Sequence, residues 1–141
     1  MKTIGRHLIA EYYGCDGKLA GDPEVIRRNL RAAAELVGAT VVGEAYHRFE
    51  PDGVTGVVLI AESHLSIHTW PSRGYVAVDI FTCGGLDPRP GCELLAQALA
   101  AERLRYQEIV RGLPDEIADD KELLPDDVLV ATDLGEARPL R

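Results

Sequence analysis

Two spacings of hydrophobic residues alternate along the first 112 positions of the chain. Alternate apolar positions and short apolar runs predict strands, which we expect at residues 3–13, 39–49, 54–62, 64–70, 75–83 and 105–110. Apolar residues three or four positions apart predict two helices, over residues 23–38 and about 90–104. This order of elements is typical of an α+β fold, a two-layer sandwich in which two helices pack on one face of a largely antiparallel sheet.

The first predicted helix has sequence signals at both of its ends. Asp22 is a favourable N-terminal cap, and Pro23 is favourable at the first helical position because its missing N–H costs nothing there. Gly38 is suited to the left-handed conformation in which many helices end. Turn residues at 51–53 and 71–74 separate the predicted strands on either side of them.

Length and charge divide the chain into a domain and a tail. Its 141 residues suffice for one domain with a buried core. The net charge is −8, and residues 113–141 carry nine acidic and only three basic side chains. We therefore expect a domain over residues 1–112 and a solvated acidic tail over 113–141. The chain has no basic patch of the kind that binds nucleic acid.

The apolar segments are short, and the cysteines are few. No apolar run approaches the roughly 20 residues that span a membrane, and the start of the chain reads as a strand rather than a signal peptide, so we expect a cytoplasmic protein. Cys15, Cys83 and Cys92 form no Cys-x-x-Cys motif. This argues against a disulfide framework or a structural zinc site and favours reduced thiols.

Reactive side chains are concentrated between residues 61 and 85. His64 and His68 lie four apart on a predicted strand, where they would be roughly 13 Å apart, too far to bind one metal ion. Alternation puts both histidines and Ser66 on one face. From the pattern alone, the simplest interpretation is a half-buried strand with a polar outer face. Cys83, at the end of the next strand, could be a packed apolar side chain or a reactive thiol.

The same region carries a resemblance to a known family. The sequence Glu-Ser-His-Leu-Ser-Ile-His-Thr-Trp-Pro at 62–71, with Gly-Tyr at 74–75 and Phe-Thr-Cys-Gly at 81–84, resembles the short bacterial and archaeal class of pyruvoyl-dependent S-adenosylmethionine decarboxylases. The resemblance extends to Gly-Arg-His-Leu at 5–8 and His-Arg-Phe at 47–49. The resemblance implies the same kind of fold, because members of that family have a sheet with helices on one face.

The resemblance implies a proenzyme that cleaves its own backbone between Glu62 and Ser63. Ser63 would become a pyruvoyl group at the new N-terminus, the cofactor that forms a Schiff base with the substrate. By the same resemblance His68 is the proton acceptor in processing and Cys83 is the proton donor in catalysis. Thr55, where the family often has Ser, would support the cleavage by donating a hydrogen bond from its hydroxyl.

The resemblance also implies a substrate and an assembly. S-Adenosylmethionine would be decarboxylated to the aminopropyl donor of polyamine biosynthesis, without a metal ion. Phe49 matches an aromatic residue that stacks on the adenine. Ser72 stands where the family pattern has a Glu whose carboxylate holds the ribose hydroxyls. Members associate as dimers of cleaved protomers with sites near the interface.

Two alternatives stay open at this point. Because Ser72 departs from the family pattern, a sister pyruvoyl-dependent arginine or ornithine decarboxylase fits as well; it would need a carboxylate for the substrate's distal cation, for which Glu44, Glu50 and Asp52 are candidates. The other alternative is a non-catalytic α+β domain that binds a small ligand. An uncleaved chain would distinguish it, since a binding module has no need of a cut backbone.

Overall fold

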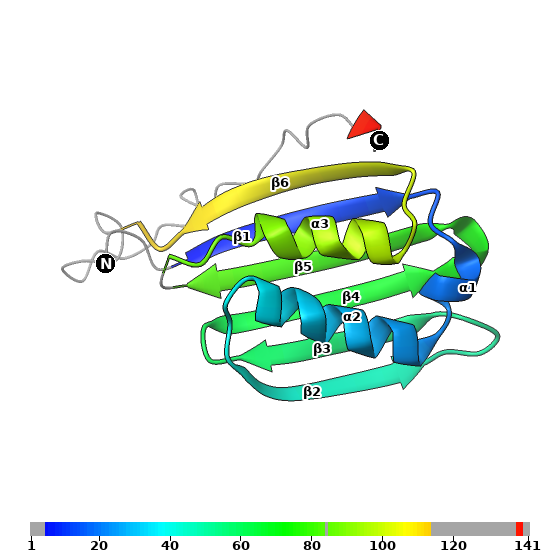
Figure 1. Cartoon of the computed structure of the whole chain (residues 1–141), viewed down its shortest axis with the longest axis horizontal. Coiled ribbons are helices and arrows are strands. Elements are labelled where there is room, and N and C mark those ends of the chain that lie inside the picture. The colour runs from blue at the N-terminus through cyan, green and yellow to red at the C-terminus, as the bar shows by residue number, and fades with distance from the viewer. Residues whose placement is uncertain (1–4, 84, 114–137, 140–141) are drawn as a thin grey trace, which may run out of the picture.

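The alternating segments form one antiparallel sheet in a computed structural model, which describes residues 5–83, 85–113 and 138–139 (Figure 1). The strand order is β2-β3-β4-β5-β1-β6-β7. The strands are β1 (Gly5–Tyr13), β2 (Val41–Arg48), β3 (Val54–Ile60), β4 (Ser63–Trp70), β5 (Tyr75–Cys83), β6 (Arg103–Arg111) and the two-residue β7 (Arg138–Pro139). All neighbouring strands in this order run antiparallel to each other.

The helices lie on one face of the sheet, and among the described residues the other face has no helical cover. Figure 1 shows α2 (Pro23–Leu36) and α3 (Arg89–Ala98) side by side across the same face. A one-turn helix, α1 (Gly17–Ala20), precedes α2, and a 3-10 turn, η1 (Pro71–Arg73), joins β4 to β5. The predicted α+β two-layer sandwich is therefore confirmed.

Helix α2 forms because favourable residues at both of its ends flank a segment with an apolar stripe at helical spacing. The Asp22 carboxylate accepts a hydrogen bond from the Glu24 N–H at 3.0 Å, which satisfies one of the free donors of the first turn. Gly38 follows the helix at φ +87°, a conformation that is unfavourable for residues with a Cβ. The stripe at Ile26 and Leu30 is fully packed against the sheet.

The core lies between the helices and the sheet, and alternate residues of the strands form the side of the core that belongs to the sheet. Fully buried side chains include Leu8 and Tyr12 on β1, Val54 and Val58 on β3, Leu65 and Ile67 on β4, Val78 and Ile80 on β5, and Leu95 and Leu99 of the α3 segment. The hydroxyl of Tyr12 is buried among them and donates a hydrogen bond to the Cys92 carbonyl at 2.8 Å. Burial raises the pKa of Tyr12 well above its usual value.

The predicted end of the second helix was wrong. α3 ends at Ala98 instead of continuing to 104, and Ala100 adopts a left-handed φ of +52°. The chain then turns back to the sheet, where the Glu102 N–H donates to the Tyr13 carbonyl at 2.9 Å. The last strand accordingly begins at Arg103, two residues earlier than expected. Helix α1 was missing from the prediction.

Most of the predicted acidic tail, residues 114–137 and 140–141, lies outside the described residues. Within it, Arg138–Pro139 pairs with β6 through Leu104 and Arg103. No helix in the part of the chain that the structure describes is long and apolar enough to cross a membrane. All three cysteines are free, as the sequence predicted.

Candidate active site

The helix-free face of the sheet carries the reactive side chains that the alternation predicted. On β4, Leu65 and Ile67 are fully buried against the helices, whereas His64, Ser66 and His68 lie on the opposite face and are partly exposed. On β5, alternate apolar residues are likewise buried. The predicted polar strand face is therefore confirmed.

Four residues meet where β3 turns into β4 and β5 ends; we call them the cleavage cluster (Glu62, Ser63, His64 and Cys83). The Cys83 thiol donates a hydrogen bond to the Glu62 carbonyl oxygen, with 2.8 Å between sulfur and oxygen. Ser63 Oγ lies 3.3 Å from His64 Nδ1. The carbonyl, hydroxyl, imidazole and thiol thus surround a single peptide bond.

The backbone at that peptide bond is strained. Ser63 has φ +141°, a region that residues with side chains rarely adopt and that costs on the order of 1–3 kcal/mol. Cys83 is also the one cysteine of the three that is not buried. Burial raises the pKa of Cys15 to about 11, which keeps that thiol protonated and unreactive.

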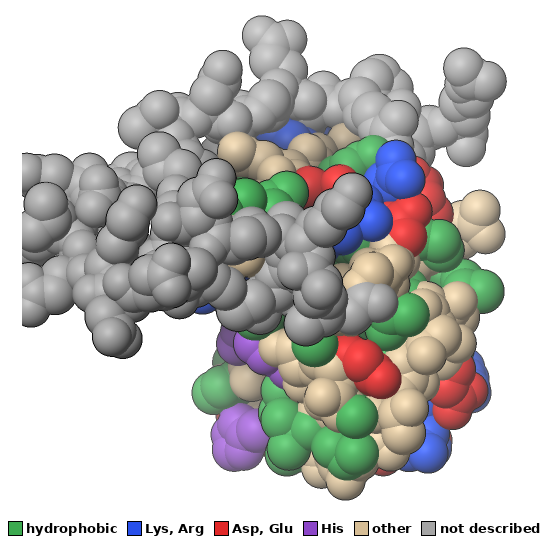
Figure 2. Space-filling model, turned by 90° about the vertical axis from the view of Figure 1, so that its left-hand side faces the viewer, with side chains coloured by type: hydrophobic (Ala, Val, Ile, Leu, Met, Phe, Trp, Pro, Cys, Tyr) green, Lys and Arg blue, Asp and Glu red, His purple; other side chains and the backbone are tan. Residues whose placement is uncertain are grey.

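Aromatic and charged side chains border the cleavage cluster on the helix-free face. The Phe81 ring contacts the His64 and His7 rings at centroid distances of 5.8 and 5.3 Å, and the Arg111 guanidinium lies 4.5 Å from its centre. Hydrogen bonding to His7 lowers the pKa of the Asp79 carboxyl. Figure 2 views this end of the molecule and shows histidine side chains gathered beside hydrophobic ones.

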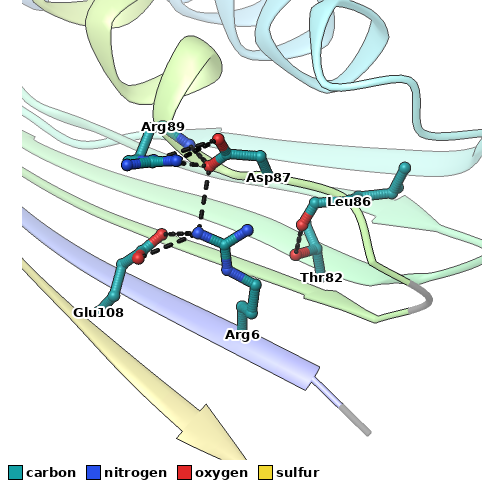
Figure 3. Close-up of polar contacts among 6 residues, drawn as sticks. All are labelled: Arg6, Thr82, Leu86, Asp87, Arg89 and Glu108. Carbon is teal, nitrogen blue, oxygen red and sulfur yellow. Dashed lines mark hydrogen bonds and ion pairs between the residues drawn. The ribbon is translucent and has the colours of Figure 1, made fainter. Parts of the chain in front are cut away.

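The segment that follows Cys83 is anchored on the helix side of the sheet (Figure 3). Arg6 on β1 donates to both carboxylate oxygens of Glu108 at 2.8 and 3.0 Å, and it contacts Asp87 at 3.3 Å. Hydrogen bonds from Arg89 lower the pKa of Asp87 to about 2. The Thr82 hydroxyl donates to the Leu86 carbonyl at 2.9 Å. These contacts tie Leu86 to strand β5 and Asp87 to strand β1.

A second group of predicted residues lies at the other end of β4. A cavity of about 500 Å³, which we call the distal pocket, is lined by Phe49, Asp52, Gly53, Thr55, His68, Thr69, Trp70 and Ser72. Thr55 Oγ1 and His68 Nδ1 are at a hydrogen-bond distance of 3.0 Å. Phe49 and Trp70 are 48% and 45% exposed, so two flat aromatic faces are available to a ligand.

The structure separates the predicted processing base from the predicted nucleophile within one chain. Ser63 pairs with Ile60 at the start of β4, and His68 pairs with Thr55 near its end. Five residues of extended strand span about 16 Å. The imidazole beside Ser63 belongs to His64, to which the sequence interpretation gave no role in processing or catalysis. Its position immediately after Ser63 was the signal that could have identified it.

The two groups suit different chemistry. The cleavage cluster offers a hydroxyl next to a carbonyl that already accepts a hydrogen bond, the arrangement needed for acyl transfer within the backbone. The distal pocket offers aromatic surface, hydroxyls and one carboxylate, an arrangement suited to binding a small polar ligand. Within the described ranges no three His, Cys, Asp or Glu side chains are arranged to hold a metal ion.

Curated proteins resemble the chain over most of its length. The family model described as S-adenosylmethionine decarboxylase matches residues 6–112. The S-adenosylmethionine decarboxylase proenzyme of Thermotoga petrophila is 50% identical over 118 residues, which cover 83% of this chain and 91% of that protein. The corresponding proenzyme of Caldanaerobacter subterraneus is 48% identical over 114 residues, or 80% and 92% of the two chains.

Solved structures resemble the fold. The adenosylmethionine decarboxylase from Aquifex aeolicus is 35% identical with a TM-score of 0.74, covering 88% of this chain and 100% of that one. The Trypanosoma brucei AdoMetDC-delta26 monomer, at 16% identity and a TM-score of 0.55 over 72% of this chain and 44% of that one, shows a likeness of fold alone. Together with the match over residues 6–112, these similarities mean that the chain belongs to the S-adenosylmethionine decarboxylase family.

Proposed function

We propose that the chain is a self-cleaving proenzyme whose mature form decarboxylates S-adenosylmethionine. Family membership supports this reaction, and the relatives' names favour it over arginine or ornithine decarboxylation and over a binding module without chemistry. The observation that carries the self-cleavage is the geometry of the Glu62–Ser63 peptide bond. A hydroxyl, an imidazole and a thiol donor converge there on a strained backbone.

Cleavage begins when Ser63 Oγ attacks the carbonyl carbon of Glu62, which converts the amide into an ester and frees the Ser63 nitrogen. His64 Nδ1 is near enough to take the hydroxyl proton. Negative charge develops on the Glu62 oxygen in the tetrahedral intermediate, and the Cys83 thiol stabilises it by the hydrogen bond that it already donates. The rearrangement also relieves the strained conformation of Ser63.

Elimination then separates the two fragments. A base removes the Cα proton of Ser63, and the ester C–O bond breaks, which leaves a carboxylate on Glu62 and a dehydroalanine at residue 63. Water replaces the nitrogen of that residue, ammonia leaves, and a ketone remains. We assign the proton removal to His68, whose Nδ1 is held by the Thr55 hydroxyl.

The mature site combines the resulting group with residues of the same cluster. A pyruvoyl group supplies a ketone that binds the substrate's amine and accepts the electron pair left when carbon dioxide departs. The residues around Ser63 fit such a group, because the Cys83 thiol lies against the Glu62–Ser63 peptide bond as a proton donor and is partly accessible. To Cys83, whose thiol lies against the Glu62–Ser63 peptide bond, we assign the return of a proton to the substrate after decarboxylation.

We infer that two copies of the chain complete each site. His68 lies about 16 Å from Ser63 along β4, too far to act on it within one chain. If two helix-free faces pack in opposite directions, the distal pocket of one copy meets the cleavage cluster of the other. Leu59, on that face and 49% exposed, would be covered in such a dimer.

Co-expression of two inactive variants tests this arrangement. Ser63→Ala has no nucleophile and His68→Ala has no processing base, so neither should cleave alone. In a mixed dimer the His68→Ala chain keeps Ser63 and borrows His68 from its partner. Intact-mass analysis should show cleavage of the His68→Ala chain only, in about half of its copies if pairing is random. Two uncleaved chains would contradict a shared site.

The substrate is tested on processed protein. Release of carbon dioxide from S-adenosylmethionine, arginine and ornithine should be compared as kcat/KM, and S-adenosylmethionine should exceed both others at least tenfold. The two half-exposed aromatic side chains of the distal pocket support a substrate with a flat base. A higher kcat/KM for either amino acid would overturn the proposed substrate. We place the enzyme in the cytoplasm, a compartment consistent with three free cysteines.

A further inference from the structure

We propose that Asp52 is a specificity-determining residue whose carboxylate accepts hydrogen bonds from the ribose hydroxyls of the substrate. The inference rests on the proposed function, because it places a nucleoside in the distal pocket. Asp52 is the one lining residue of that pocket with a fixed charge. It lies in the turn between β2 and β3, three residues after the half-exposed Phe49.

Asp52 and Ser72 lie where two cavities meet. A neighbouring cavity of about 500 Å³ is lined by Asp16, Gly17, Lys18, Asp52, Pro71 and Ser72. Asp52 and Ser72 are the two residues that line both this cavity and the distal pocket. Asp52 therefore lies at the boundary of the cavity that Phe49 and Trp70 line, a position suited to the sugar of a nucleoside whose base lies against either ring.

The turn holds Asp52 in place while leaving its carboxylate available. The Phe49 N–H donates to the Gly53 carbonyl at 2.9 Å, which closes the turn. Gly53 has φ +110°, and a Cβ there would lie 3.1 Å from the Thr69 carbonyl oxygen, so the turn packs closely on β4. Asp52 itself makes no hydrogen bond or ion pair with any other residue that the structure describes. The backbone of the turn is thus held in place, and the exposed carboxylate of Asp52 is free to bind a ligand.

The other two candidate carboxylates are not in the pocket. Glu44 lies 3.8 Å from Arg27 and 3.5 Å from Arg31, both on helix α2, and so is directed to the helix side of the sheet. Glu50 belongs to the same turn as Asp52 but does not line either cavity. Of these three candidate carboxylates, Asp52 is thus the one that lines the distal pocket.

The chemistry of the pocket favours a vicinal diol as the group that Asp52 recognises. A carboxylate has two acceptor oxygens and can receive one hydrogen bond from each of two neighbouring hydroxyls. Ser72 offers only a neutral hydroxyl, so it cannot provide this charge-assisted pair. A guanidinium or ammonium group would also bind a carboxylate, and the experiment separates the two cases.

Binding of a neutral nucleoside to the processed enzyme tests the inference. 5′-Methylthioadenosine has the base and the ribose hydroxyls but lacks the α-amino group of the substrate's amino-acid part, so it does not form a Schiff base with the cofactor. Its affinity and that of its 2′,3′-dideoxy analogue are measured by calorimetry. Asp52→Asn should weaken binding of 5′-methylthioadenosine about ten- to a hundred-fold and leave the dideoxy analogue unchanged.

Three further variants complete the design. Glu50→Gln, which removes the same charge from the same turn, should bind both nucleosides like the parent enzyme. Asp52→Glu keeps a carboxylate and should keep the preference for the ribose, even if Asp52→Asn folds poorly. Ser72→Glu in the Asp52→Asn background brings a carboxylate back to the edge shared by both cavities and should restore most of the lost affinity.

The outcomes distinguish this inference from the proposed function. If the parent enzyme binds 5′-methylthioadenosine but Asp52→Asn binds it equally well, Asp52 has no such role while the function stands. Equal weakening of both nucleosides would mean a disturbed pocket and would also overturn the inference. If the parent enzyme binds neither nucleoside and decarboxylates arginine or ornithine, the proposed function itself is wrong.

Discussion

Replacing Cys83 by alanine tests whether its hydrogen bond to Glu62 contributes to the proposed self-cleavage. The Cys83 thiol donates a hydrogen bond to the Glu62 carbonyl oxygen at 2.8 Å, the oxygen on which charge would develop in the proposed attack by Ser63. Alanine fills the same backbone position without a donor. The attacking hydroxyl and the neighbouring His64 are unchanged, so any slowing reports the loss of this hydrogen bond.

The size of the effect follows from the kind of donor. Removing one donor from an oxyanion site usually costs about 100- to 1,000-fold in rate. A thiol is a weaker donor than an amide, so we expect a smaller loss, about tenfold, or about 1.4 kcal/mol in activation free energy. Cys83→Ser keeps a donor and should cleave faster than Cys83→Ala. Both variants should lose decarboxylation activity, because alanine has no proton to donate and a hydroxyl is a poorer acid than a thiol.

The assay follows the proenzyme from its synthesis. Labelled chain is made by translation in vitro, synthesis is stopped, and the uncleaved fraction is measured by denaturing electrophoresis over time. Ser63→Ala gives the baseline without cleavage. Processing of Cys83→Ala at the parent rate would show that the hydrogen bond has no role in cleavage. Equal slowing of Cys83→Ala and Cys83→Ser would show that shape, rather than hydrogen-bond donation, is what cleavage requires.

Three other predictions concern the scaffold. Tyr12→Phe removes a buried hydrogen bond to the Cys92 carbonyl and should lower the free energy of unfolding in urea by about 1 kcal/mol. Because the Asp87 pKa is lowered to about 2, its stabilising contribution is complete above about pH 4 and is lost as the pH falls towards 2. Asp87→Asn should remove this part of the acid sensitivity in thermal melts, by under about 1 kcal/mol, since the carboxylate is 37% exposed. Truncation after Gly112 should leave processing intact in the electrophoretic assay, and a truncated chain that folds but stays uncleaved would give the tail a role.

The sequence predicted those elements whose local signals agree with their packing. Asp22 and Pro23 mark the start of α2 as clearly in the sequence as in the structure. The end of α3 could not be predicted, because residues 99–102 are Leu, Ala, Ala and Glu, all favourable in helices. There the hydrogen bond from Glu102 to Tyr13 on β1 outweighs local preference, and Ala100 takes the left-handed position without a glycine to signal it.

The same limit applies to the site. Alternation alone put His64, Ser66 and His68 on one face of β4, and that is where they lie. It could not show that Cys83 and Glu62, 21 residues apart, meet at one hydrogen bond, because that contact depends on how β5 pairs with β4. The resemblance also assigned Ser63 and His68 to the same processing reaction, but it could not show that an extended strand holds them at opposite ends.

Intact-mass spectrometry of the purified protein tests the central claim most directly. Cleavage between Glu62 and Ser63 predicts two fragments, residues 1–62 and 63–141. The second should be lighter, by the mass of one ammonia, than the fragment with an N-terminal serine, and it should resist N-terminal sequencing. Ser63→Ala should give one intact chain. A parent protein that stays uncleaved after prolonged incubation, or a second fragment that begins with an unmodified serine, would contradict the proposed self-processing.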